Sequence, residues 1–184
     1  MTTNGKGISS AWLVAKPQVD YHKRGDFHFM TETISTEAVD SKPQRHKVTG
    51  DVHLVLRRGS DVLFGQRQNT GFEDGAWHLP SGHLEADESV IDALIREAEE
   101  EIGVTIAPDD VHFSHIMHNS SSGGRMAFFF TVRTWQGEPT NREPEKCSAL
   151  EWFAADALPD HMIDYCRVAM GHIAQGRSFS VYGW

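Results

Sequence analysis

Three things are scarce in this sequence, and each shortage excludes a class of protein. Only two of the 184 residues are cysteine, Cys147 and Cys166, which excludes a framework of several disulfides and suits a reducing cytoplasm, although one disulfide would still be compatible. No apolar run approaches the ~18 residues of a membrane helix, and no basic-then-apolar leader is evident, so we expect neither a membrane span nor a signal peptide. Basic residues number 17 against 26 acidic ones, and the resulting formal net charge of −9 argues against a nucleic-acid-binding surface.

The rest of the composition is ordinary for a globular protein. Hydrophobic residues make up 39% of the chain and charged residues 23%, and the length is sufficient for one domain with a core plus an extension. Small anionic substrates remain compatible with the acidic balance, because a metal ion can neutralise a local acidic site.

The first part of the chain is expected to be an N-terminal extension, residues 1–47, followed by one domain, residues 48–184. Residues 27–39 are rich in β-prone side chains, which predicts one or two short strands, and Ser-Lys-Pro at 41–43 is typical of a linker. An apolar strand outside the core needs cover, so we expect a homodimer to which residues 12–39 contribute.

The domain itself has the pattern of alternating strands and helices. Apolar residues at 52, 54 and 56 alternate with polar ones, which predicts a half-buried strand, and the turn at 58–61 predicts a hairpin with a return strand at 62–67. Further strands are expected at 111–117, 125–135 and 150–153, the last as the final strand, followed by a helix over 163–174. Strands around a central helix, with a second helix at the end, predict an α/β layered domain with a mixed sheet.

The central helix is the clearest element, over residues 89–102. Ile91, Leu94, Ile95, Ala98 and Ile102 recur at spacings of three and four and therefore share one face. Ser89 is expected to cap the N-terminus and Gly103 the C-terminus.

A second face of the same helix carries three carboxylates. Glu97, Glu100 and Glu101 are spaced so that their Cβ atoms lie about 5–6 Å apart, and only Arg96 opposes their charge. Such a cluster repels itself unless cations occupy it, and its oxygen ligands suit Mg²⁺ or Mn²⁺.

The helix lies within a longer pattern of fixed spacing. From residue 82 the chain has Gly, five residues, Glu, seven residues, then Arg-Glu-apolar-any-Glu-Glu-any-Gly-apolar. This segment, 82–104, resembles the Nudix box in every fixed position. The resemblance implies an α/β/α sandwich and metal-dependent hydrolysis of nucleoside diphosphates that are linked to another group.

Carried over by position, the resemblance implies a role for each fixed residue of the box. Glu97, Glu100 and Glu101 would be metal ligands, one of the box glutamates also serving as base, and a backbone carbonyl of Ser81 or Gly82 would complete the shell. Arg96 would orient a box glutamate, with Glu88 as its partner. Gly82 also lies where the chain must turn from strand to helix and pass close to a metal ion, which favours a residue without Cβ.

Candidate substrate-binding residues flank the box. His78 and His83 lie close to it, and Arg67 lies in the preceding strand. The stretches NTGFEDG at 69–75, EPEKC at 143–147 and EWF at 151–153 resemble those of a subset of bacterial Nudix proteins, and in them Glu143 and Glu145 are candidates for a further ligand, base or substrate contact. Several aromatic residues are candidates for stacking on a base, or for the core. They are Phe72, Trp77, Phe113, Phe128 and Trp135.

Histidines at 112, 115 and 118 form a row in a predicted strand, where 115 points away from the other two, so a zinc site there is not favoured. The leading hypothesis is a pyrophosphohydrolase that converts a nucleoside triphosphate to the monophosphate and pyrophosphate. The alternatives are hydrolysis of a nucleotide sugar or another nucleoside diphosphate derivative, a non-catalytic nucleotide-binding module, and an isoprenoid diphosphate isomerase.

Overall fold

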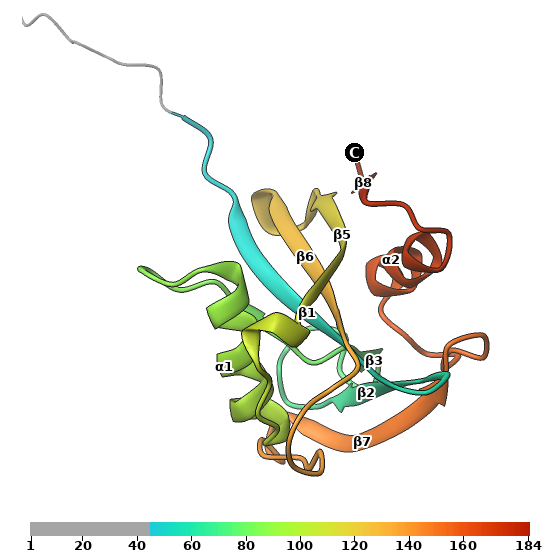
Figure 1. Cartoon of the computed structure of the whole chain (residues 1–184). Helices are drawn as coiled ribbons and strands as arrows, with labels where there is room; N and C mark the ends of the chain where they lie inside the picture. Colours follow the sequence, from blue (N-terminus) through green and yellow to red (C-terminus); the bar gives the residue numbers. More distant parts are fainter. Residues whose placement is uncertain (1–44) are drawn as a thin grey trace, which may run out of the picture. The chain divides into compact units, whose positions relative to one another are not determined.

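The computed structural model describes residues 45–184 (Figure 1). The predicted strands at 27–39 and the expected dimer contact at 12–39 lie outside the described residues. Within the described residues, no helix is long and apolar enough to cross a membrane.

Eight strands in residues 45–184 form one mixed sheet around a central strand, β1 (Thr49–Arg58). The others are β2 (Asp61–Arg67), β3 (Trp77–His78), β4 (Ser81–His83), β5 (His112–Asn119), β6 (Arg125–Val132), β7 (Cys147–Ala154) and β8 (Phe179–Tyr182). The strand order is β3-β2-β1-β6-β5-β8, with β4 paired to β1 and β7 paired to β2. β1 is parallel to β6 and antiparallel to β4, so the predicted mixed sheet is confirmed.

The two α-helices cover opposite faces of the sheet, α1 (Val90–Ile102) on one side and α2 (Asp164–Ala174) on the other (Figure 1). Two short 3₁₀ turns, η1 (Pro108–Asp110) and η2 (Ser121–Gly123), lie on either side of β5 in the chain. One hydrophobic core lies on the α1 side and a second on the α2 side. The α/β/α sandwich expected from the resemblance is therefore confirmed.

Helix α1 begins and ends where its sequence predicts. The Ser89 side chain accepts a hydrogen bond from the Asp92 backbone N–H, and the Asp92 carboxylate accepts one from the Ser89 backbone in return, which completes a capping box. Gly103 closes the helix in the left-handed conformation at φ 69°, where glycine has no steric penalty. Leu94, Ala98 and Ile102 are buried, and the acidic face lies along the side of this buried face, with Glu97 and Glu101 half-buried and Glu100 exposed.

The expectation that β1 is half-buried is wrong. Every residue from 51 to 56 is buried, because Val52 and Leu54 face the α1 core while Val55 faces the α2 core. The polar residues Asp51 and His53 therefore lie inside the protein, where Arg125 on β6 forms an ion pair with Asp51. A buried polar residue on a central strand has the same sequence pattern as an exposed one.

The hairpin after β1 is present only at its turn. β1 and β2 pair only at Arg57–Val62 and Arg58–Asp61, and further along β2 the short strand β3 pairs with Gly65 and Gln66. β7 pairs with β2 along its whole length. The prediction of a final strand at 150–153 is also wrong in its order. That strand is β7, and β8 follows α2 and pairs in parallel with β5.

Candidate active site

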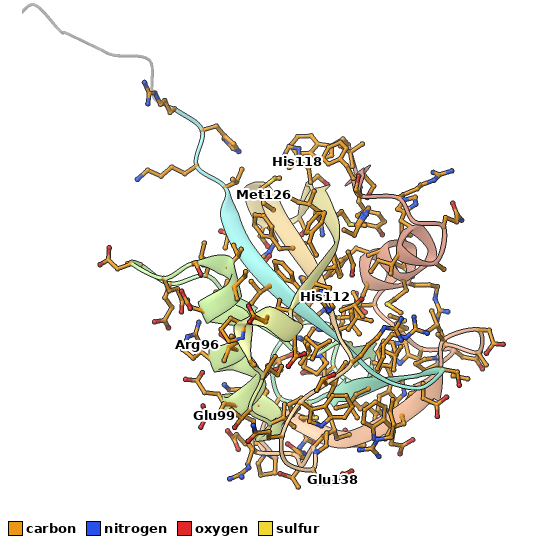
Figure 2. The ribbon with its side chains drawn as sticks, viewed as in Figure 1. Arg96, Glu99, His112, His118, Met126 and Glu138 are labelled. Carbon is orange, nitrogen blue, oxygen red and sulfur yellow. The ribbon has the colours of Figure 1, made fainter. Side chains whose placement is uncertain are left out.

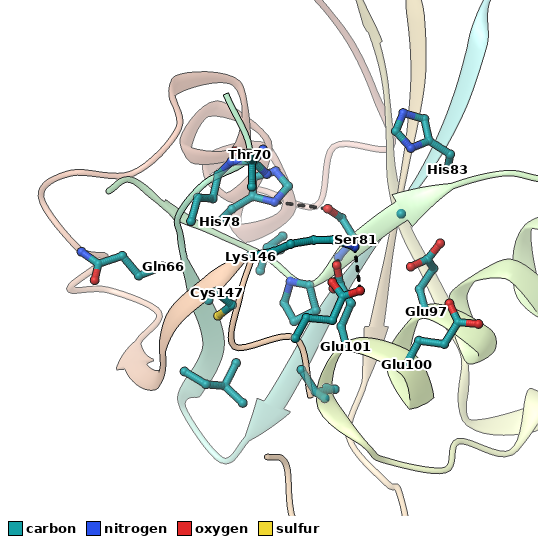
Figure 3. A pocket seen from close by; sticks show the side chains of 18 of the residues that line it. Gln66, Thr70, His78, Ser81, His83, Glu97, Glu100, Glu101, Lys146 and Cys147 are labelled. Atoms are coloured by element: carbon teal, nitrogen blue, oxygen red, sulfur yellow. Dashed lines mark hydrogen bonds and ion pairs between the residues drawn. The ribbon is translucent and has the colours of Figure 1, made fainter. Parts of the chain in front are cut away.

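A cleft of about 630 Å³ lies between the N-terminal part of the Nudix-like box, the acidic face of α1, β2 and the loop before β7. Its lining includes most of the residues that the sequence singles out, and Figure 3 shows them converging from these elements. The ionisable residues that line the cleft are Arg67, His78, His83, Glu85, Arg96, Glu97, Glu100, Glu101, Glu143 and Lys146.

Glu97 packs against the backbone of Gly82. A Cβ placed on Gly82 would lie 1.8 Å from Glu97 Cδ, far inside any real contact distance. Only a glycine therefore lets this carboxylate lie against the backbone of β4. The side chain of Glu97 is 17% exposed, and burial is the largest of the effects that raise its pKa.

Arg96 holds the carboxylates of three glutamates. Its guanidinium donates two hydrogen bonds to Glu88, at 2.8 and 3.1 Å, and others to Glu97 at 2.7 Å and Glu100 at 3.1 Å. The expected contact between Arg96 and Glu88 is thus present. The hydrogen bond from Arg96 lowers the pKa of Glu88, and the same pair raises the pKa of Arg96.

Among the three carboxylates on the acidic face of α1, Glu101 is the one without a cationic partner. Its Oε2 accepts a hydrogen bond of 2.8 Å from the backbone N–H of Ser81, and none of the ion pairs within residues 45–184 includes it. Burial, helped by the nearby charge of Glu97, raises its pKa to about 8. A carboxylate left in this state is stabilised by any cation that enters the cleft.

The donor set fits a hard divalent cation. The carboxylates of Glu97, Glu100 and Glu101 line one wall with the backbone of Ser81 and Gly82, and all of these donors are oxygens. In the arrangement seen, Glu97 and Glu100 point to Arg96, so that no three His, Cys, Asp or Glu side chains of the described residues form a ready coordination group.

Two further basic residues, Lys146 and Arg67, also line the cleft. Lys146 lies beside Glu143, with 2.7 Å between Nζ and Oε1. Arg67 is held by the carbonyl of Phe72 and the hydroxyl of Thr70 in the loop after β2. Glu145, which sequence reasoning grouped with Glu143, is exposed and lies outside the cleft lining.

The two histidines near the box differ in their environment. His78 is 6% exposed, and burial lowers its pKa to about 3, so its ring is neutral and offers no charge to a phosphate. His83 is exposed and lines the cleft, where its Nε2 lies 2.9 Å from a guanidinium nitrogen of Arg125.

None of the five aromatic candidates is part of the cleft lining. Trp77 packs edge-on against Phe153, Phe128 packs against the α1 core, and Trp135 stacks on Trp152. Phe72 and Phe113 are exposed.

Histidines 112 and 118 lie at opposite ends of β5 (Figure 2). His115, between them, is buried, with its ring nitrogens within 2.8 Å of Arg177 O and Ser180 Oγ.

Sequence reasoning missed two residues of this region. Lys146 follows Glu143 by three positions, a spacing that could have indicated the pair. Tyr165 on α2 bonds to His78 across 87 positions of sequence, and no local pattern indicates that contact.

The comparison with known proteins agrees with this geometry. The model of the NUDIX domain matches residues 47–168. Phosphatase NudJ of Escherichia coli O1:K1 is 29% identical over 82 residues, which cover 45% of this chain and 54% of that protein, so the chain spans about half the length of the curated relatives it matches.

Solved structures show the same fold. The MutT NUDIX hydrolase from Burkholderia pseudomallei superposes with a TM-score of 0.62 at 26% identity, over 68% of this chain and 97% of that one. The MutT protein from Methanosarcina mazei Go1 has the same TM-score at 17% identity, over 72% and 96%. The matched domain spans well over half of the sequence and contains the whole acidic wall of the cleft, and on this basis the chain belongs to the NUDIX domain family, the family of the Nudix hydrolases.

Proposed function

We propose that this Nudix hydrolase is a Mg²⁺- or Mn²⁺-dependent pyrophosphohydrolase that converts a nucleoside triphosphate to the monophosphate and pyrophosphate. The observation that carries the proposal is the pair of neighbouring carboxylates, Glu97 and Glu101, whose pKa values burial raises in a cleft that polar groups line. Two neighbouring carboxylates in one cleft favour the binding of a cation, and the bound cation in turn favours an anionic substrate.

The residues that line the cleft have separate tasks in this proposal. Glu97, Glu100 and Glu101 would hold the metal ion, which would supply positive charge for the phosphates and lower the pKa of a water molecule. Lys146 and Arg67, which also line the cleft, contact the phosphate oxygens and offset their charge. Arg96 holds the carboxylates in orientation through its bonds to Glu88, Glu97 and Glu100.

The chemical step is water attack on a phosphorus atom. The new P–O bond forms to the water oxygen, the bond to the bridging oxygen breaks, and pyrophosphate leaves. The proton lost by the water passes to a box carboxylate, and a carboxylate with a raised pKa, such as Glu97, accepts a proton more readily.

A second candidate is release of orthophosphate from a nucleotide or another phosphate ester. The similarity to a protein named Phosphatase NudJ favours it, although that similarity covers only about half of either chain. Hydrolysis of a nucleoside diphosphate derivative would use the same carboxylates, and the screen below includes such substrates.

The test is a screen of nucleoside triphosphates, diphosphates and nucleotide sugars with Mg²⁺ and Mn²⁺. Free phosphate is measured with and without added inorganic pyrophosphatase, and with and without a phosphomonoesterase. Phosphate that appears only with pyrophosphatase supports the proposal, and phosphate without either auxiliary enzyme supports the second candidate. Absence of any metal-dependent product across the panel contradicts both.

A further inference from the structure

A line of hydrogen bonds connects helix α2 to the acidic wall of the cleft. The hydroxyl of Tyr165 lies 2.7 Å from Nε2 of His78, and Nδ1 of the same ring lies 3.2 Å from Oγ of Ser81. The backbone N–H of Ser81 in turn donates to Glu101 at 2.8 Å. Figure 3 shows the two bonds that meet at Ser81.

The chemistry of the imidazole determines which groups donate and which accept along this line of hydrogen bonds. A neutral imidazole has one N–H donor and one acceptor nitrogen, so one of the two hydroxyls donates to His78 and the other accepts from it. Burial keeps His78 neutral by lowering its pKa, and burial raises the pKa of Tyr165. Both groups therefore stay uncharged near neutral pH, and the line holds positions without moving charge.

The backbone around His78 connects the same two elements. The N–H of Trp77 donates to His161 O, and the N–H of Ile163 donates back to Trp77 O, which ties the start of α2 to β3. On its other side the segment is held to β1, where the N–H of Leu54 donates to Pro80 O. The side chain of His78 lies between these two attachments.

We propose that Tyr165 and His78 are positioning residues that act through Ser81 to set the place of the Glu101 carboxylate in the cleft. The proposal adds to the proposed function and rests on it, because it takes the cleft to be the site of hydrolysis. It assigns to α2, which contributes no residue to the cleft lining, a role in arranging the residues that do.

The first experiment uses Tyr165→Phe, which removes only the hydroxyl. Tyr182→Phe is the matched control, because Tyr182 packs 6.5 Å from Tyr165 between ring centres and lies outside the line. Nitrogen-15 NMR of the metal-free full chain reports the His78 ring nitrogens and the amide at position 81. We expect both signals to shift in Y165F and to stay at their wild-type positions in Y182F. Unchanged signals in Y165F would overturn the proposal.

The second experiment is a double-mutant cycle with Ser81→Ala, which removes Oγ and keeps the backbone N–H. With a substrate from the screen, Y165F should lower kcat by about 10-fold with little change in KM, the size typical of a residue that supports a site from behind. The same change should cause no further loss in the S81A background, because the line is already broken there. An equal loss in both backgrounds would show that Tyr165 acts by another route, and the proposal would be wrong.

The two experiments separate this proposal from the proposed function. If no nucleotide is hydrolysed, the proposed function fails and the NMR comparison alone decides the positioning role. Should Y165F fail to fold, S81A takes its place, since removal of Oγ must also shift the His78 ring signals. Unshifted His78 signals in S81A would refute the line.

Discussion

The carboxylate of Glu97 occupies the space in which a side chain on residue 82 would begin. A Cβ on Gly82 would lie 1.8 Å from Cδ and 1.9 Å from Oε1 of Glu97. Two fixed positions of the box, fifteen residues apart in the sequence numbering, are therefore coupled by direct contact.

Gly82→Ala tests this coupling. The backbone of Gly82 is not in the left-handed region, so alanine is tolerated there, but Glu97 must leave its place. We expect kcat to fall by about 10²-fold, as for loss of a well-placed electrostatic group, while the melting temperature changes little. Gly171→Ala is the control, because nothing lies within 4 Å of a Cβ on this exposed residue of α2. It should keep full activity and gain about 0.5–1 kcal/mol of stability.

Glu97→Gln and Glu100→Gln should each lower kcat by at least about 10²-fold, because each removes a charge from the acidic wall. The matched control is Glu99→Gln, an identical change on an exposed residue of α1 that lies outside the cleft lining. Steady-state rates of the wild type and the three variants measure the loss of activity, and circular dichroism checks that all four proteins are folded. Normal turnover in both cleft variants would remove these residues from the proposed site.

Glu101→Gln should stabilise the metal-free protein, and by more at high pH. Burial raises the folded-state pKa of Glu101 to about 8, whereas in the unfolded chain it is near 4.3. Between these two values the unfolded chain releases its proton and the folded chain keeps it, so wild-type stability falls as pH rises through this window. Urea unfolding should show almost no gain for the variant near pH 4 and a gain that grows as the pH rises toward 8, by about 1.4 kcal/mol for each pH unit of this window. An equal effect at both pH values would contradict the raised pKa.

Metal removal should abolish turnover, and Mg²⁺ or Mn²⁺ should restore it. Addition of Mg²⁺ to metal-free protein in weak buffer near pH 7 should also release protons, because a ligand carboxylate must be ionised. Glu101→Gln should release fewer, since Glu101 holds its proton at that pH in the metal-free state. Full activity in excess EDTA would exclude the metal mechanism.

The homodimer expected from the N-terminal sequence stays a prediction. By light scattering, the full chain should have the mass of two chains, and a chain that lacks residues 1–41 should have the mass of one. The reason is that the β-prone stretch at 27–39 would then be missing. If the shortened chain keeps the assembly state and solubility of the full one, the segment has no interface role.

Helix α1 and its acidic face were predictable because their signals are local. The apolar period, Ser89 as cap, Gly103 as closing residue and the spacing of the glutamates all lie within one short segment. The contact between Arg96 and Glu88 belongs to the same group, since both residues lie within the box.

The rest of the site depends on contacts between distant segments. The burial of Asp51 requires Arg125, and the neutral state of His78 depends on its burial near α2. Glu145 and Glu143 are alike in sequence, and only the fold of their loop places one in the cleft and leaves the other outside. Strand β8 is short, and its apolar residues Phe179 and Val181 are exposed, so the hydrophobic pattern of its sequence does not indicate which face meets the sheet.

The parallel pairing of β1 with β6 also determines when this domain can fold. Asp51 and Arg125, whose side chains form the ion pair between these strands, are 74 positions apart. During synthesis β1 emerges first and stays without this neighbour until β6 has left the ribosome, and contacts of such long range form slowly. A nascent or truncated chain that ends before residue 125 therefore exposes the edge of β1 that pairs with β6 and the face of β1 that α2 covers, and it depends on chaperones or on rapid completion to avoid aggregation.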